Sequence, residues 1–190
     1  MIQISYISVF IFISVLWVIV RVICAIAKKG VDWAYEARLI TVYICLVVIA
    51  RFVYFPLEVV NGRLAYLEFD ISRIIPPRIN VEPFVYMFYR YSGWLINIIG
   101  NITMFIPVGI FWPMCFKKLD RIWKVVLAGF GLSLFIELSQ LLFYSRLTDV
   151  DDLIMNTAGV TIGAILYFFI RAIVRTLGKH GKKRGKKGMS

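Results

Sequence analysis

Histidine and charged side chains are scarce in this chain. Of its 190 residues, only His180 is a histidine and 17% are charged, whereas charged residues make up about a quarter of an average soluble domain. The sequence therefore predicts neither a zinc site built on histidines nor a Ser-His catalytic pair. The three cysteines, Cys24, Cys45 and Cys115, fall in or at the ends of apolar segments without a Cys-x-x-Cys motif. We interpret them as packed free thiols.

Long hydrophobic segments dominate what is present. Hydrophobic residues make up 61% of the sequence. They recur in runs of roughly 20, the length that crosses a bilayer as a helix. We predict a single all-α polytopic membrane domain over residues 1–178, followed by a basic cytoplasmic tail at 179–190. The five transmembrane helices are expected at 4–27, 39–60, 94–116, 122–144 and 152–174.

A long extracytoplasmic loop is expected at residues 61–93. Asn61-Gly62 is a turn signal, and the stretch after it partly alternates between apolar and polar residues, as in a short hairpin or strand. Aromatic residues crowd the end of the loop before Trp94, which indicates a segment lying at the membrane interface. The loop therefore has two candidate structures, a short hairpin and an interfacial segment.

The positive charge of the chain is unevenly placed. The net charge is +11, and basic residues gather in the loops after the first and third spans and in the tail. Because basic loops stay on the cytoplasmic side, we predict the amino terminus outside and the carboxyl terminus inside. A basic tail directly after a membrane helix indicates an anchor on anionic lipid. The expected partner is therefore membrane lipid and not nucleic acid.

A short polar run interrupts the fourth and fifth apolar segments. Ionisable groups at membrane depth are costly and are functional candidates by default. A rise of about 1.5 Å per residue places Asn101 of the third span at about the depth of Glu137. Arg51 of the second span is the expected ionic partner of Glu137. The members of the run are Glu137, Gln140, Arg146, Thr148, Asp149, Asp151, Asp152 and Asn156.

Two structures are compatible with this convergence of polar groups. One is a polar cavity open to the outer surface, and the other is a buried structural network in which Glu137 pairs with Arg51. Arg146 could bind a phosphate or carboxylate, or it could pair with Asp149 or Asp152. The sequence requires no cofactor, although Glu137, Asp149 and Asp152 could hold a divalent cation.

Small residues recur at a spacing of four. The two pairs are Gly159-x-x-x-Gly163 and Gly129-x-x-x-Ser133. Such pairs let helix backbones approach closely within a membrane. We therefore predict close helix packing at both.

Four blocks of sequence carry a family resemblance. They are Asn80-Val-Glu-Pro-Phe84, Asn101-Ile-Thr-Met-Phe-Ile-Pro-Val-Gly109, Phe135-Ile-Glu-Leu-Ser-Gln140 and Arg146-Leu-Thr-Asp-Val-Asp-Asp-Leu-Ile-Met-Asn-Thr-Ala-Gly159. In order and spacing, these blocks resemble the VanZ-like membrane protein family. The resemblance implies a bacterial cytoplasmic-membrane protein, and the namesake of the family is linked to lowered susceptibility to the lipoglycopeptide teicoplanin. The family motif maps onto Asn101, Pro107, Gly109, Glu137, Gln140, Arg146, Asp149, Asp152, Asn156 and Gly159.

Three functions remain open at this stage, and the oligomeric state is open as well. The first is a binding or resistance protein that engages an amphiphile, such as a lipid-linked cell-wall precursor or the lipoglycopeptide. The second is an intramembrane enzyme that modifies a headgroup, with Glu137, Asp149 and Asp152 as candidate acids and bases and amides stabilising an oxyanion. The third is a membrane scaffold. The candidate ligand-binding residues are Asn101, Gln140, Arg146, Asn156 and Arg51.

Overall fold

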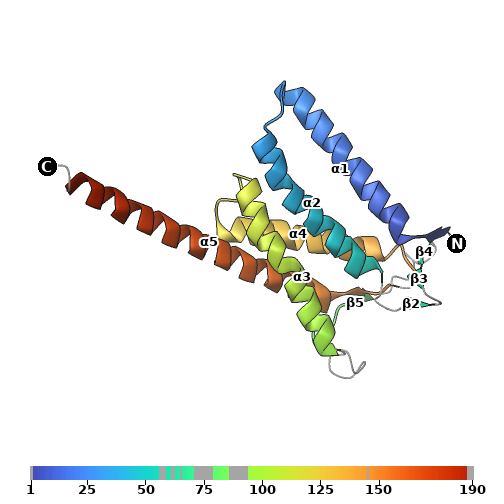
Figure 1. Cartoon of the computed structure of the whole chain (residues 1–190). Coiled ribbons are helices and arrows are strands. Elements are labelled where there is room, and N and C mark those ends of the chain that lie inside the picture. The colour runs from blue at the N-terminus through green and yellow to red at the C-terminus, as the bar shows by residue number, and fades with distance from the viewer. Residues whose placement is uncertain are drawn as a thin grey trace.

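The computed structural model describes residues 2–55, 59–60, 63–64, 66–70, 79–85, 94–144 and 146–187. In this part of the chain five helices are long and apolar enough to cross a membrane, which confirms the predicted all-α polytopic class. Figure 1 shows their arrangement. The helices are α1 (Tyr6–Lys28), α2 (Trp33–Tyr54), α3 (Trp94–Cys115), α4 (Ile122–Gln140) and α5 (Val150–Lys187).

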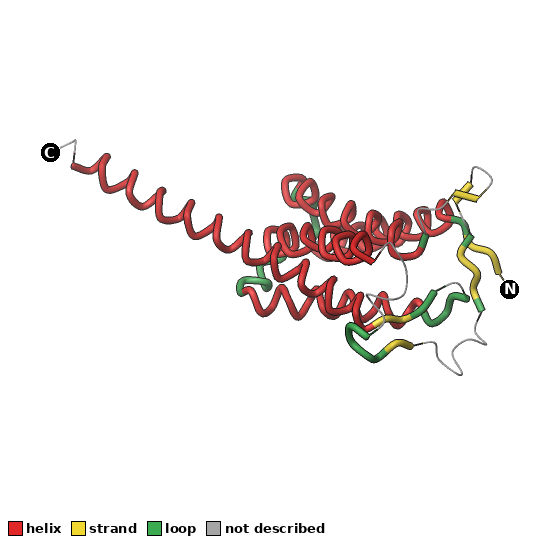
Figure 2. Tube along the Cα trace, turned by 90° about the horizontal axis from the view of Figure 1, so that it is seen from below, coloured by secondary structure: helices red, strands yellow, loops and turns green. Residues whose placement is uncertain are grey.

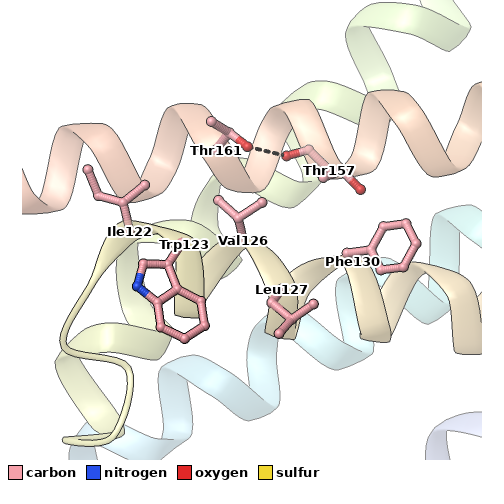
Figure 3. Close-up of a pocket in the computed structure, with 7 residues that line it drawn as sticks. All are labelled: Ile122, Trp123, Val126, Leu127, Phe130, Thr157 and Thr161. Atoms are coloured by element: carbon pink, nitrogen blue, oxygen red, sulfur yellow. Dashed lines mark hydrogen bonds between the residues drawn. The ribbon is translucent and has the colours of Figure 1, made fainter.

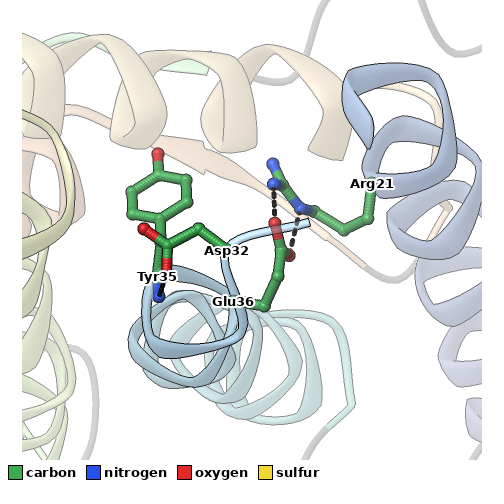
Figure 4. Close-up of polar contacts among 4 residues, drawn as sticks. All are labelled: Arg21, Asp32, Tyr35 and Glu36. Atoms are coloured by element: carbon green, nitrogen blue, oxygen red, sulfur yellow. Dashed lines mark hydrogen bonds and ion pairs between the residues drawn. The ribbon is translucent and has the colours of Figure 1, made fainter. Parts of the chain in front are cut away.

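Helix α2 begins at Trp33 rather than near residue 39. Asp32 caps the helix, because its Oδ1 accepts a hydrogen bond of 3.1 Å from the backbone N–H of Tyr35. Glu36 then lies in the first turn and forms an ion pair with Arg21 of α1. Figure 4 shows both contacts. Residues 33–38, which were predicted to lie in a loop, thus belong to the helix, because the cap and the ion pair satisfy the polar groups there.

Helix α5 is longer at both ends than the expected span 152–174. It begins at Val150 and continues through basic residues to Lys187, so that its last part projects beyond the other helices (Figure 1). Its apolar portion ends at Leu177. Helix α4 is shorter than expected and ends at Gln140. The connection from α4 to α5 is therefore longer than predicted.

Short strands gather at the end of the bundle where α4 leads into α5 (Figure 2). The strands β2 and β3 flank residues 61–62 and pair antiparallel, which confirms a hairpin at the predicted turn; residues 61–62 themselves lie outside the described part. Strands β1 and β4 also pair antiparallel, whereas β5 and β6 pair in parallel. Their bounds are β1 (Ile2–Ile4), β2 (Val59–Val60), β3 (Arg63–Leu64), β4 (Leu67–Phe69), β5 (Ile79–Asn80) and β6 (Thr148–Asp149).

Helices α3 and α5 pack backbone against backbone. A Cβ atom at Gly159 would collide with the carbonyl oxygen of Ile102, and one at Gly163 would collide with that of Ile106. On the α3 side, a Cβ at Gly109 would collide with α5 in the same way. The predicted close packing at Gly159 and Gly163 is confirmed, and it brings α3 against the first turns of α5.

Helix α4 closes the core on the other face of α5. Val125 and Val160 are fully buried, and so are Phe105 and Val108 of α3. A Cβ at Gly129 would meet the Val160 side chain, which confirms close packing at this small residue too. The three helices α3, α4 and α5 thus form the packed centre, and their shared end carries the polar residues discussed next.

Candidate functional site

Two polar stripes face each other at the shared end of α4 and α5. On α4, Ser133, Glu137 and Gln140 follow one face at i, i+4 and i+7, and all three are buried, with Glu137 3% and Gln140 4% exposed. On α5, Asp152 and Asn156 lie in the first two turns. We call the following set the polar junction: Asn101, Glu137, Gln140, Arg146, Asp149, Asp152 and Asn156.

Glu137 anchors the strand that precedes α5. Its Oε2 accepts a hydrogen bond of 3.0 Å from the backbone N–H of Asp149. Its carbonyl oxygen accepts one of 2.7 Å from the hydroxyl of Thr148. The buried carboxyl group therefore binds backbone from the α4–α5 connection and fixes where α5 begins.

Asp149 organises the start of α5. Its Oδ1 accepts from the backbone N–H of Asp151, at 3.0 Å, and from Nδ2 of Asn80, also at 3.0 Å. Asp151 in turn accepts at Oδ1 from the backbone N–H of Phe84 at 2.9 Å. An acidic side chain at a helix amino terminus satisfies N–H groups that lack a partner in the helix. Two acidic residues thus tie the segment 79–85 to α5.

Asn80, the first residue of the first family block, is a member of the site that was not predicted. Its side chain is 8% exposed, and its Oδ1 accepts from the backbone N–H of Glu82 at 3.3 Å while its Nδ2 donates to Asp149. The pairing of β5 with β6 brings the two residues opposite each other. The only sequence signal was a polar residue inside a family block, in a loop whose path could not be derived.

Asp152 receives two amides from α3. Its Oδ1 accepts from Nδ2 of Asn101 at 2.6 Å and from Nδ2 of Asn97 at 3.3 Å. The structure therefore brings Asn101 and Asp152 together, through the close approach of α3 and α5 at their glycines. These amides hold one carboxyl oxygen of Asp152 in place.

Arg51 does not join this group, and its predicted ion pair with Glu137 is wrong. Its Nη1 donates a hydrogen bond of 2.8 Å to the carbonyl oxygen of Phe55, and its guanidinium lies 5.7 Å from the ring centre of Tyr6. No ion pair links it to Glu137 within the described residues. The reason is the end of α2 at Tyr54, which places Arg51 in the last turn, where a cation favours the helix carbonyl groups.

Arg146 is the member of the polar junction that lies in the α4–α5 connection. Its Nε donates a hydrogen bond of 3.2 Å to the carbonyl oxygen of Tyr54. Burial lowers the pKa of Arg146 below its ordinary value, and the charge of Asp152 opposes that shift. Neither Asp149 nor Asp152 forms an ion pair with it in the described part of the chain. The charge of Asp152 thus acts on Arg146 without a direct ion pair between the two side chains.

Three buried polar atoms of the junction have no hydrogen-bond partner in the structure described. They are Oε1 of Gln140, Oδ1 of Asn156 and Nη2 of Arg146. Asn156 is 1% exposed, and its Nδ2 donates to the Ser133 hydroxyl at 3.0 Å, so only its acceptor is left over. Most buried polar groups in proteins have a partner, and leaving one without costs about 1–3 kcal/mol. Two acceptors and one cationic donor of the junction are thus left without a partner among the described residues.

The carboxyl groups of the junction do not form a metal site in the residues described. No group of three or more His, Cys, Asp or Glu side chains converges closely enough to hold a metal ion there. The geometry consequently gives no support to a divalent cation on Glu137, Asp149 and Asp152. The predicted outward opening of the junction stays a prediction.

The comparison with known families decides what kind of protein this is. A family model described as VanZ/LLP1 matches residues 40–171. The chain belongs to the VanZ/LLP1 family. The resemblance found in the four sequence blocks is thereby confirmed, and the matched region contains the whole polar junction while leaving α1 outside.

One curated relative extends this result. Protein VanZ from Enterococcus faecium is 33% identical over 105 residues, which cover 55% of this chain and 62% of the relative. The chain therefore spans less than two thirds of the length of that VanZ protein. No solved structure matches the chain.

Proposed function

We propose that this VanZ-like chain is a bacterial envelope protein that lowers susceptibility to lipoglycopeptides such as teicoplanin. In this proposal the polar junction opens to the extracytoplasmic side and binds the polar head of an amphiphile. The amphiphile is a lipid-linked cell-wall precursor or the lipoglycopeptide itself, and binding shields the cell envelope. Family membership and the similarity to Protein VanZ support the resistance role.

The observation that carries the binding role is the set of unpartnered buried atoms. The amide oxygens of Gln140 and Asn156 accept hydrogen bonds, as from ligand hydroxyl or amide N–H groups. Nη2 of Arg146 donates to a carboxylate or phosphate. A head with an anionic group beside hydroxyl or amide groups offers partners to all three atoms. Sugar-peptide heads have this chemistry, which suits both proposed ligands.

Binding accounts for the carboxyl groups better than catalysis does. Glu137 accepts from the Asp149 backbone, Asp149 caps α5, and one oxygen of Asp152 accepts from two amides. A general acid or base has to exchange a proton with the substrate at hydrogen-bond distance. Here each carboxyl group is engaged in holding the helices, so we assign the three residues to the frame of the site. Conversion of a ligand would favour the enzyme alternative.

The test is ligand binding by the whole chain in lipid nanodiscs. Teicoplanin and a lipid-linked cell-wall precursor are titrated separately, and both the dissociation constant and the mass of the recovered ligand are measured. We expect one of the two to bind and to be recovered with unchanged mass. Gln140→Met removes an acceptor at similar volume, and Asn156→Leu removes an acceptor together with the amide that donates to Ser133. Each should weaken binding about tenfold, the size of one lost buried hydrogen bond.

A matched control separates binding from general damage. Thr176→Val removes a polar group near the far end of α5, where the hydroxyl donates to the carbonyl oxygen of Ala172, and it should leave the dissociation constant unchanged. In cells, expression of wild type should raise the teicoplanin concentration needed to stop growth, and the two junction variants should lose that gain. If both folded variants bind the ligand as tightly as wild type, the proposed site is refuted. If the recovered ligand has an altered mass, the protein is an enzyme and not a binding protein.

A further inference from the structure

An apolar groove runs between α4 and α5, away from the unpartnered atoms of the polar junction. It has a volume of about 740 Å³. Its α4 wall runs from Ile122 to Phe130 and includes the exposed side chains of Trp123 and Leu127, as Figure 3 shows. The α5 wall includes Thr157 and Thr161. The groove thus follows the first half of α4 from its amino-terminal end.

The threonine hydroxyls on the α5 wall of the groove are already used within the helix. The hydroxyl of Thr157 donates to the carbonyl oxygen of Leu153 at 2.7 Å, and that of Thr161 donates to the carbonyl oxygen of Thr157 at 2.8 Å. The second bond is drawn in Figure 3. The indole nitrogen of Trp123 is the remaining polar atom among the lining side chains. Such a surface suits a hydrocarbon chain lying along α4.

Positive charge surrounds the end of the groove at which α4 begins. Lys117, Lys118 and Arg121 are exposed there. The acidic residue in the same loop, Asp120, forms an ion pair of 2.6 Å with Lys124. Arg121 occupies the cap position of α4, and no side chain caps that helix start. Its first backbone N–H groups therefore add a partial positive charge.

The ends of the groove thus differ in charge and polarity. About 1.5 Å per residue gives the stretch from Ile122 to Phe130 a length of roughly 12 Å. An acyl chain laid along it would place its glycerophosphate at the basic start of α4. Arginine side chains and helix amino termini both attract a phosphate group. A headgroup with a net negative charge is therefore bound more strongly at this end of the groove than a headgroup with no net charge.

We propose that the α4–α5 groove is a binding site for an anionic bilayer phospholipid. One acyl chain occupies the groove, and the phosphate group binds at Arg121 and the start of α4. This site is separate from the polar junction and does not depend on its proposed function. The charge complementarity selects an anionic lipid over a zwitterionic one.

Photo-crosslinking tests this proposal on the whole chain in nanodiscs. Two probes carry the same diazirine-bearing acyl chain, one as phosphatidylglycerol and the other as phosphatidylcholine, and labelled peptides are identified by mass spectrometry. We expect the phosphatidylglycerol probe to label residues 122–130 preferentially. Arg121→Gln should reduce that labelling about fivefold, the size expected for one basic residue near an anionic membrane surface.

Two matched controls make the result specific. Arg175→Gln removes an exposed cation further along α5 and should leave labelling at 122–130 unchanged. Leu127→Trp should fill the groove and reduce labelling by both probes, whereas Leu138→Trp, at another exposed leucine of α4, should not. Circular dichroism and gel filtration of each variant identify any that misfold, and labelling is compared among folded variants only.

Three results would overturn the proposal. Equal labelling of residues 122–130 by the two probes in wild type would mean that the groove does not select for charge. Unchanged labelling in Arg121→Gln would show that the phosphate group does not bind at Arg121. An oxidised dimer of a Leu127→Cys variant would mean that a second copy of the chain fills the groove instead of lipid.

Discussion

At the scale of single residues, the polar groups of this chain are held by specific partners. Asp152 accepts from two amides, Asn156 donates to Ser133, and Glu137 accepts from a backbone N–H. In a low-dielectric interior an unpaired polar group is costly, so these bonds restrict each side chain to one orientation. The atoms that remain without a partner therefore stand out as candidate ligand contacts.

The two amides on Asp152 allow a residue-level test. Asn101→Ala removes the donor at 2.6 Å, and Asn97→Ala removes the donor at 3.3 Å to the same oxygen. We expect Asn101→Ala to lower the free energy of unfolding by about 1–3 kcal/mol, because the partly buried carboxyl group of Asp152 loses its closer donor. Denaturation in detergent micelles, followed by tryptophan fluorescence, measures this energy.

Asn97→Ala serves as the control for that measurement. Asn97 is exposed and its bond is longer, so its loss should cost less than that of Asn101. An equal or larger loss of stability in Asn97→Ala would mean that the amide of Asn97, and not that of Asn101, is the main partner of Asp152.

At the scale of elements, caps and close contacts decide where helices begin and how near they come. Asp32 starts α2 and Asp149 starts α5 through bonds to backbone N–H groups. Glycine lets α3 and α5 approach until a Cβ would not fit between them. These local features position the polar stripes of α4 and α5 opposite each other.

Gly163 provides the element-level prediction. Gly163→Ala forces a Cβ against the carbonyl oxygen of Ile106, so helix separation should increase and the free energy of unfolding should fall by about 1–3 kcal/mol. Gly131→Ala is the matched control, because nothing lies within 4 Å of its Cβ position. The control should raise stability by up to about 1 kcal/mol through helix propensity alone.

Unfolding curves of the two glycine variants, recorded under one set of detergent conditions, measure this difference. A Gly163→Ala protein as stable as Gly131→Ala would show that α3 and α5 do not meet at this residue. The packing on which the position of Asn101 depends would then be incorrect.

At the scale of the whole molecule, the basic residues before α4 and the polar junction lie at opposite ends of that helix. Residues 117–124, which lead into α4, are basic, whereas the polar junction lies at the other end of α4. The positive-inside rule predicts that the basic end faces the cytoplasm. The proposed function needs this orientation, because a cell-wall ligand reaches the protein from outside.

Cysteine accessibility tests the orientation. In a variant whose native cysteines are replaced by alanine, Val81→Cys adds a thiol at a residue that is 70% exposed near β5. Lys117→Cys adds one at the basic end. A membrane-impermeant maleimide should label Val81→Cys in intact cells and Lys117→Cys only after permeabilisation. The reverse pattern would place the junction in the cytoplasm and contradict an extracellular ligand.

Structural features set by residues close together in the sequence were predicted, and specific contacts between distant segments were not. The five spans were predicted, and a short hairpin was one of the two candidate structures of the loop, because hydrophobic runs and turn residues act within a few residues. The partner of Arg51 was predicted wrongly, because it depended on the end of α2 at Tyr54, which places Arg51 beside the carbonyl oxygen of Phe55. Asn80 received no role, because its contact with Asp149 joins segments distant in the chain.

The sequence by itself determined the membrane class, the number of spans and the identity of nearly every polar residue at the junction. These follow from composition, since hydrocarbon tolerates few polar groups and makes each of them conspicuous. Only the tertiary structure decided which polar atoms meet and which stay without a partner. That outcome depends on distances of a few ångströms, set by the glycine contacts of α3 with α5 and by the caps that begin the helices.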